Sequence, residues 1–397
     1  MTLVWISFLA ALILMITIAR NNLWLGLTTG ALTLGLFNLP IIEVIKIFLS
    51  TITDTSILLL AVSVGIIPLI GGALEISGLM NDLIKSIRIK SKTFLMLAPA
   101  FMGMLPMPGG ALLSAPIISK VGKHVSNNDY TAINVWFRHV LILIYPLGAL
   151  LACSKMANLN LYYEMLLLIP GFTLLAMLGY IFLLKSVDAN HKLEGTSNLK
   201  KSLIPALVVI SAPVIHITLM SSFKDILPEI PLLIGVAFSL LLVFFFGKLP
   251  IKSLKQLSIK MKPWKFFLII IAMFIFLNMF KASNVSAAIS VIVFSKTFLI
   301  VGIGVFLGFV TGRVQVPVSI ILPIFYSKFG IESMTPIVFA IMFFAIFMGY
   351  VVSPVHPCVS VSLEYFQTEL KDFYMKLSIP TLIAIAVVSL FSILLIG

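Results

Sequence analysis

The chain has 397 residues, of which 60% are hydrophobic and only 10% are charged. An ordinary soluble domain carries roughly a quarter charged residues, so this composition and the mean hydropathy of +1.17 exclude a soluble fold. The formal charge of +13 comes from basic residues in short loops between apolar runs, where they report membrane orientation, and no nucleic-acid partner is expected. Cys153 and Cys358 are isolated, which excludes a disulfide framework and a CxxC metal knuckle, and no metal site is expected.

Ten apolar runs approach the length needed to cross a hydrocarbon core of ~30 Å. The first run has no basic residue before it and Arg20 after it, so we interpret it as a transmembrane helix and not as a secretory signal. The pattern predicts an all-α polytopic membrane protein with about ten transmembrane helices. These cover residues 3–19, 23–38, 55–74, 130–153, 161–184, 202–222, 230–247, 266–281, 333–356 and 377–396.

Two further apolar stretches, residues 93–122 and 298–326, are interrupted near the middle by residues that cannot continue a helix. We interpret both as re-entrant helical hairpins. Backbone that is not helical is tolerated at membrane depth only inside protein or along a water-filled cavity, so both tips are expected to line a cavity. The interrupting residues include Pro106, Pro108, Gly109 and Gly110 in the first hairpin and Thr311, Gly312, Arg313 and Gln315 in the second.

The basic residues predict how the chain sits in the membrane. If the N-terminus is outside and each hairpin returns to its own side, 19 Lys and Arg residues face the cytoplasm and six face outside. Cytoplasmic loops carry the excess of Lys and Arg in membrane proteins. The count therefore predicts a multi-pass protein of the cell membrane with both termini outside.

The order of these segments repeats within the chain. Residues 1–184 and residues 202–397 each contain two spans, a surface stretch, a third span, a short stretch, a hairpin and two more spans, and residues 185–201 form a polar cytoplasmic linker. Because each half has an odd number of spans, the second half is predicted to be inverted. Inverted repeats with broken helices are typical of secondary transporters. The alternative is that proline and glycine are simply more frequent in membrane helices.

Two motifs supply candidate site residues. The span after the first hairpin carries Asn134, Arg138 and His139; the alternatives for Arg138 are snorkelling to the headgroups or pairing with Asp129. Because Arg138 and His139 are consecutive on a helix, we expect that they do not share one face and that one of them is structural. The corresponding span of the second half is broken by two prolines, which free backbone groups for a ligand beside Ser353 and His356. For His356 the alternative is a packing histidine.

Three separated motifs are Leu105 to Ala111 with Ser114-Ala115-Pro116, Asn134 to His139, and Ser353 to Cys358 with Glu364-Tyr365-Phe366. In these motifs the chain resembles the integral membrane family labelled domain of unknown function 401, which is similar to the ion-transporter superfamily of secondary carriers, including gluconate permeases and citrate and dicarboxylate carriers. The resemblance implies that the hairpin tips and the unwound spans hold substrate and coupling ions. It departs from sodium-coupled dicarboxylate carriers, whose Ser-Asn-Thr tips are absent, and Pro357 departs from the family pattern.

The charges narrow the expected substrate. All 14 acidic residues lie in loops or at span ends, whereas Arg138, His139, Arg313 and His356 lie inside the membrane segments. This distribution favours a carrier of a small organic anion of carboxylate type, driven by a coupling ion, Na⁺ or H⁺, with no other cofactor. The alternative is a cation or proton exchanger, or a channel-like protein. The sequence contains no HExxH motif and no mid-membrane carboxylate that would indicate an enzyme, so no enzyme activity is expected. The expected partners are the anionic solute and the bilayer, and a homodimer stays an open option.

Overall fold

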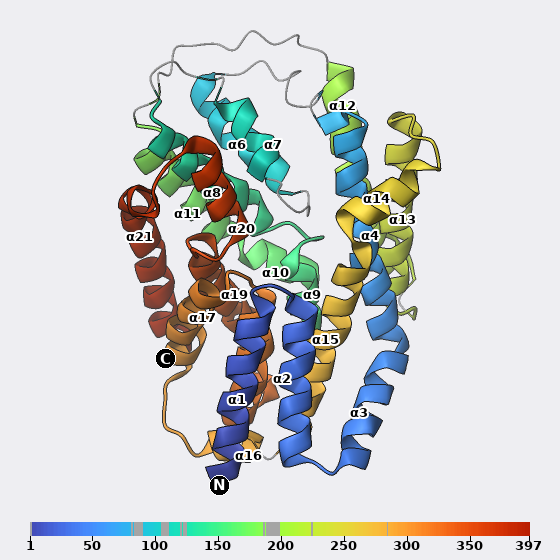
Figure 1. The fold of residues 1–397 in the computed structure, drawn as a ribbon, viewed down its shortest axis with the longest axis vertical. Helices are drawn as coiled ribbons and strands as arrows, with labels where there is room; N and C mark the ends of the chain where they lie inside the picture. The colour runs from blue at the N-terminus through green and yellow to red at the C-terminus, as the bar shows by residue number, and fades with distance from the viewer. Residues whose placement is uncertain are drawn as a thin grey trace.

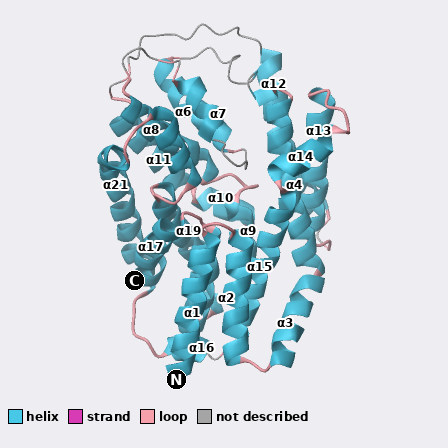
Figure 2. Ribbon diagram, in the orientation of Figure 1, coloured by secondary structure: helices cyan, strands magenta, loops and turns pink. Residues whose placement is uncertain are grey.

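A computed structural model describes residues 2–80, 82, 90–104, 111–119, 121, 125–185, 187, 199–223, 225–283 and 285–397. Helices joined by loops make up this part of the chain, and no β-strand occurs in it (Figure 2). The predicted all-α class is therefore confirmed. The first hairpin tip, with Pro106, Pro108, Gly109 and Gly110, lies outside the described residues.

Five helices are long and apolar enough to cross a membrane. A sixth span is added if α10 (Leu161–Leu167) and α11 (Ile169–Leu183) count as one, since they are bent by 43° where Pro170 enters the first turn of α11. The helices α1 (Thr2–Ala19) and α2 (Leu23–Asn38) are apolar but shorter. The predicted membrane protein is thus supported, and the count of ten spans stays a prediction. The five long helices are α4 (Thr55–Ile76), α12 (Leu199–Ser222), α13 (Glu229–Phe246), α15 (Pro263–Ala282) and α21 (Leu370–Ile396).

The outer helices expose apolar side chains on a scale that fits lipid. Only 22% of the apolar window of α12 and 28% of that of α21 are buried inside the protein. Side chains such as Leu207, Ile210, Leu382 and Leu394 are more than half exposed. Contiguous apolar surface of this extent is rare on soluble monomers and marks a membrane-facing surface.

The helices form two bundles that lie side by side (Figure 1). The first bundle consists of α1 to α4 and α12 to α15, including α3 (Ile41–Thr53) and α14 (Ser253–Met261). In it α2 packs on α15 and α13 packs on α4. The short helix α3 also packs on α15, and the short helix α14 also packs on α4. The second bundle consists of α6 to α11 and α16 to α21. Each bundle therefore takes helices from both halves of the chain.

The second bundle contains four interrupted helix pairs. Gly312 ends α17 in the left-handed conformation at φ 58°, which favours glycine, and Pro357 begins α20 at a position where a missing N–H costs nothing. The break between α17 and α18 thus lies where the sequence predicts it, and the re-entrant hairpin stays a prediction. The pairs are α6 (Ser91–Gly103) with α7 (Ala111–Ile118), α8 (Asn127–Ile142) with α9 (Ala149–Met156), α17 (Gly304–Thr311) with α18 (Gln315–Phe329), and α19 (Pro336–Val351) with α20 (Pro357–Phe366). Three short helices, η1 (Phe298–Ile303), α16 (Val285–Ser290) and η2 (Ile331–Ser333), flank the second hairpin.

Glycines let the interrupted helices cross at backbone distance. A Cβ atom added to Gly103 of α6 would lie 2.0 Å from the Arg138 carbonyl oxygen on α8. Between α17 and α19, a Cβ on Gly308 would lie 2.2 Å from the Ile346 oxygen, and one on Gly349 would lie 2.0 Å from the Val305 oxygen. No side chain fits at these crossings, and close helix crossings at glycine occur in both halves of the chain.

The crossing at Gly349 gives a stability prediction. Gly349→Ala forces α17 and α19 apart, and overpacking of this kind costs ~1–3 kcal/mol or more. The control is Gly302→Ala, whose added Cβ meets only the flexible Phe298 ring, at 3.3 Å. Thermal unfolding of the detergent-purified proteins should show a clear loss for Gly349→Ala and little for Gly302→Ala. Equal melting temperatures would contradict the tight crossing.

Candidate functional site

A cavity of about 430 Å³ lies between the two bundles. The first bundle contributes the turn between α1 and α2, with Asn21 and Trp24, together with Pro68 of α4 and Lys265 of α15. The second bundle contributes the interruptions of its helix pairs. The first bundle therefore lines the cavity with a turn and two continuous helices, and the second bundle lines it with broken helices.

All four helix pairs reach this cavity with described residues at or beside their interruptions. The wall includes Ala111 at the start of α7, Ala149 at the start of α9, Gln315 at the start of α18 and Pro357 at the start of α20. Each helix start carries unpaired N–H groups and a partial positive charge. The breaks thus bring backbone donors from both halves of the chain to one space.

The charged residues of the cavity wall are all basic. Arg138, Arg313 and Lys265 line it, and no Asp or Glu is among its lining residues in the described part of the chain. Arg138 is only 3% exposed, and its side chain hydrogen-bonds the Cys358 thiol. Asp129, its alternative partner from the sequence, forms an ion pair of 2.6 Å with Lys376. The arrangement provides an electropositive, mainly apolar pocket.

The break between α17 and α18 holds Arg313 at the cavity. The Thr311 hydroxyl donates to the carbonyl oxygens of Leu307, at 2.7 Å, and Arg313, at 3.1 Å, which fixes the turn. A Cβ on Gly312 would lie 2.9 Å from the backbone nitrogen of His356. The two broken segments of the second half therefore contact each other directly, and glycine is required at the contact.

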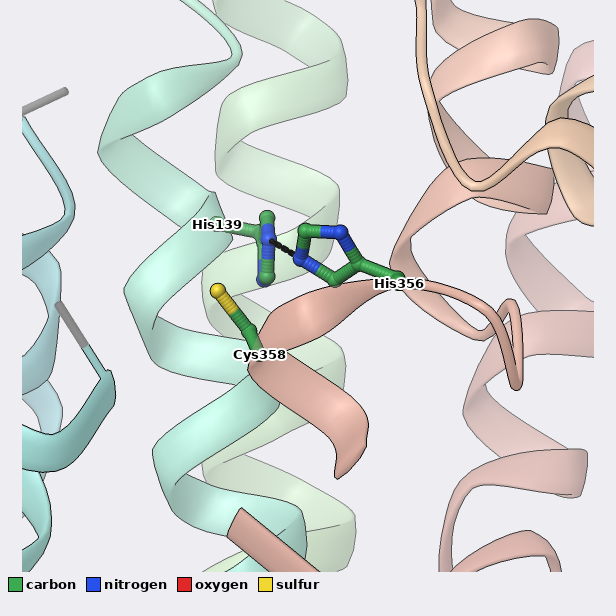
Figure 3. A group of neighbouring side chains, drawn as sticks. All are labelled: His139, His356 and Cys358. Carbon is green, nitrogen blue, oxygen red and sulfur yellow. Dashed lines mark hydrogen bonds between the residues drawn. The ribbon is translucent and has the colours of Figure 1, made fainter. Parts of the chain in front are cut away.

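His139, His356 and Cys358 form a cluster at the cavity wall (Figure 3). The Nε2 atoms of His139 and His356 lie 3.0 Å apart, and the Tyr350 ring packs against His356 with centroids 4.3 Å apart. Arg138 and His139 were expected to serve different faces of α8. They instead reach the same short segment, since Arg138 contacts Cys358 and His139 contacts His356. The cluster offers one sulfur and two imidazole nitrogens as metal ligands.

Several predicted site residues lie behind the wall and do not line the cavity. Asn134 accepts a hydrogen bond from Ser114, at 2.6 Å, and donates to Ser362 of α20, at 2.9 Å. The Ser353 hydroxyl donates to the Phe309 carbonyl at 2.5 Å. These bonds tie α7, α8, α17 and α20 together, so these side chains position the broken helices.

The structure separates the predicted residues into two described sets. Arg138, Gly312, Arg313, Gln315 and His356 line the cavity, whereas Ser114, Asn134, His139, Thr311 and Ser353 support it. Sequence reasoning missed Lys265, Trp24 and the turn at Asn21, because they are on the bundle without breaks. Lys265 had been counted only as an orientation signal, and no local pattern separates it from its neighbouring lysines.

The family described as "Protein of unknown function (DUF401)" matches residues 2–396. The chain belongs to this family. The match spans both bundles and every residue of the cavity wall. No curated protein matches the chain.

The hydrogen-bond hub at Asn134 gives a second prediction. Asn134→Ala removes its bonds to Ser114 and Ser362; Ser114 keeps a longer bond to the Ala111 carbonyl at 3.3 Å, whereas Ser362 loses this donor, and an unsatisfied buried group costs ~1–3 kcal/mol. The control is Asn278→Ala, which removes a single side-chain bond of 3.0 Å to Thr51 in a half-buried place. Thermal unfolding should show the larger loss for Asn134→Ala. A smaller loss than for Asn278→Ala would contradict the assignment of Asn134 as a hub.

Proposed function

We propose that the protein is a secondary transporter that moves a small organic anion of carboxylate type across the cell membrane by alternating access. The observation that carries the proposal is the cavity between the bundles, which is lined by Arg138, Arg313 and Lys265 without a carboxylate in its described wall. A buried cation is costly in a membrane protein and marks a pathway or a paired group. A carboxylate in the cavity brings a negative charge to these basic groups.

The chemistry of the wall suits a carboxylate in three ways. Guanidinium groups bind carboxylates with two parallel hydrogen bonds, a geometry that an ammonium group does not provide. The starts of α7, α9, α18 and α20 add backbone donors and positive ends of helix dipoles. Trp24, Phe343 and Phe347 supply apolar wall for the carbon part of a small acid.

Matched packing in the two halves supports an inverted repeat. In the first bundle α2 packs on α15 as α13 packs on α4, and α3 packs on α15 as α14 packs on α4. In the second bundle α6 crosses α8 as α17 crosses α19, each time at a glycine. Residues 1–184 and 202–397 are then two copies of one unit in opposite orientation, which is the construction of many secondary transporters.

Alternating access follows from movement of one bundle against the other. The bundles meet through few element pairs, chiefly α15 with α18 and α1 with α16 and α17, around a cavity that both line. Such movement exposes the cavity first to one side and then to the other. The transport cycle is driven by the gradient of a coupling ion, Na⁺ or H⁺.

Ion pairs between the halves agree with the orientation from the charge count. Lys260 binds both oxygens of Glu75 at 2.8 Å, and the count places both residues on the cytoplasmic side. Lys155 pairs with Glu229, and the count places both outside. These pairs fit the relative sidedness of the loops, and the charge count alone assigns the cytoplasmic side to α14 and the outer side to both termini.

Cysteine labelling tests this orientation. In intact cells, an impermeant maleimide should label Lys296→Cys, which the charge count places outside, and should label Lys255→Cys only after permeabilisation. Cys153 is buried and Cys358 is half-buried, and the unsubstituted chain measures their background. Labelling of Lys255→Cys in intact cells, with Lys296→Cys protected, would reverse the assignment.

Arg313 provides the test of the anion site. Small carboxylates such as acetate, succinate, citrate and gluconate are screened for thermal stabilisation, because a ligand that binds only the folded state raises stability by mass action. Arg313→Lys should weaken binding of a stabilising carboxylate, and Arg313→Gln should weaken it by roughly tenfold or more, since a hydrogen bond to a charged group contributes ~1.5–3 kcal/mol.

The control for these variants is Lys328→Gln, which removes a basic residue at the far end of α18, the helix that begins just after Arg313, and outside the cavity wall. It should leave the affinity unchanged. Unchanged or improved carboxylate binding by Arg313→Gln would contradict the anion site and favour a cation exchanger.

A further inference from the structure

The cluster of His139, His356 and Cys358 has the composition and the geometry of a metal site. Its ligand atoms all lie within 4.8 Å of one another, and the two histidines are 0% and 5% exposed. His139 comes from α8, whereas His356 and Cys358 come from the start of α20 (Figure 3). We propose that these three side chains bind one monovalent thiophilic metal ion, Cu⁺, and so join the first half of the chain to the second.

The hydrogen bonds of His139 prepare it as a ligand. Its Nδ1 atom lies 2.6 Å from the Val135 carbonyl oxygen and therefore carries a proton, so Nε2 of the neutral ring presents a lone pair. A backbone carbonyl that binds the second ring nitrogen is the usual support of a metal-binding histidine. The ligand nitrogen thus faces His356 in the required tautomer.

The metal-free arrangement leaves His356 incompletely paired. Because His139 Nε2 carries a lone pair, His356 must donate from its own Nε2 across the 3.0 Å contact. Its Nδ1 then has no proton, and this buried atom has no hydrogen-bond partner in the structure. When an ion binds both Nε2 atoms, the neutral His356 ring carries its proton on Nδ1 and presents Nε2 as a ligand, as His139 already does. The incomplete hydrogen bonding of His356 is therefore compatible with the tautomer that a metal ligand needs.

The distances admit an ion with little movement. Metal to imidazole bonds are ~2.0–2.1 Å long, so one ion can lie within bonding distance of two nitrogens that are 3.0 Å apart once the rings tilt their lone pairs toward it. Cys358 lies in the first turn of α20, and its sulfur is on the same side as the two rings (Figure 3). A small side-chain rotation completes a three-coordinate site.

Charge selects the kind of ion. A coordinated thiol is deprotonated outright, and thiolate ligands favour Cu⁺ and Zn²⁺ over harder ions. With two neutral imidazoles and one thiolate, Cu⁺ gives a neutral site, whereas Zn²⁺ leaves a net positive charge beside Arg138 and Arg313. When Cys358 is ionised, Arg138 donates its hydrogen bond to a thiolate instead of a thiol. The two guanidinium groups therefore oppose a divalent ion more than a monovalent one.

The test is a Cu⁺ titration of the full-length purified protein, under reducing and anaerobic conditions, in competition with a chromophoric Cu⁺ chelator. We expect one Cu⁺ per chain and no displacement by equimolar Zn²⁺. The inference does not rest on anion transport, because the readout is metal bound per chain. Absence of stoichiometric Cu⁺ in the unsubstituted chain overturns the site, and displacement by Zn²⁺ overturns its assignment to a monovalent ion.

Matched variants assign the ion to this cluster. Cys358→Ser should weaken Cu⁺ binding by at least about 10–100-fold, the loss that follows removal of even an outer partner of a metal ligand. Cys153→Ser is the control, since Cys153 is a buried cysteine of α9 outside the cluster. His356→Ala should lose Cu⁺, while His216→Ala, which removes a histidine paired with Tyr162 at 2.6 Å, should keep it. Equal Cu⁺ binding by Cys358→Ser and Cys153→Ser overturns the proposal.

Discussion

The structure depends on one constraint, which is that backbone N–H and C=O groups cannot be left unpaired in a hydrocarbon environment. Four helix pairs of the second bundle are interrupted, and residues at or beside each interruption line the cavity between the bundles. The described breaks thus open onto a shared internal cavity and not onto lipid. Glycines at the crossings and the hydrogen bonds of Asn134 and Ser353 hold the interruptions together. The position of the site follows from where the helices are allowed to break.

The two halves of the chain are interlocked and not merely adjacent. Ion pairs join Lys155 to Glu229 and Lys376 to Asp129 across the halves, and both bundles are mixed in origin. The cavity wall likewise combines Arg138 of the first half with Arg313 of the second. A site assembled in this way changes whenever the bundles move relative to each other, which is the property that alternating access needs.

The sequence predicts the local features of this fold well and its long-range contacts poorly. Gly312 and Pro357 act on their own backbone, so the breaks beside them could be located from the residues alone. The packing of α2 on α15 depends on side chains more than two hundred positions apart, and no periodicity reports it. Cys358 and His139 meet for the same reason, and spacing rules for metal motifs do not reach across two helices. The side of the cavity formed by Lys265 shows no sequence signal, because its helix is continuous.

The central claim is that the cavity carries a small organic anion across the membrane, and counterflow in proteoliposomes tests it most directly. Vesicles are preloaded with a carboxylate that stabilises the purified protein, and uptake of the labelled compound is followed over time. The account predicts saturable, transient accumulation of label in the preloaded vesicles that is lost with Arg313→Gln. Flux that does not saturate and shows no counterflow, or uptake that is unchanged by Arg313→Gln, would contradict it.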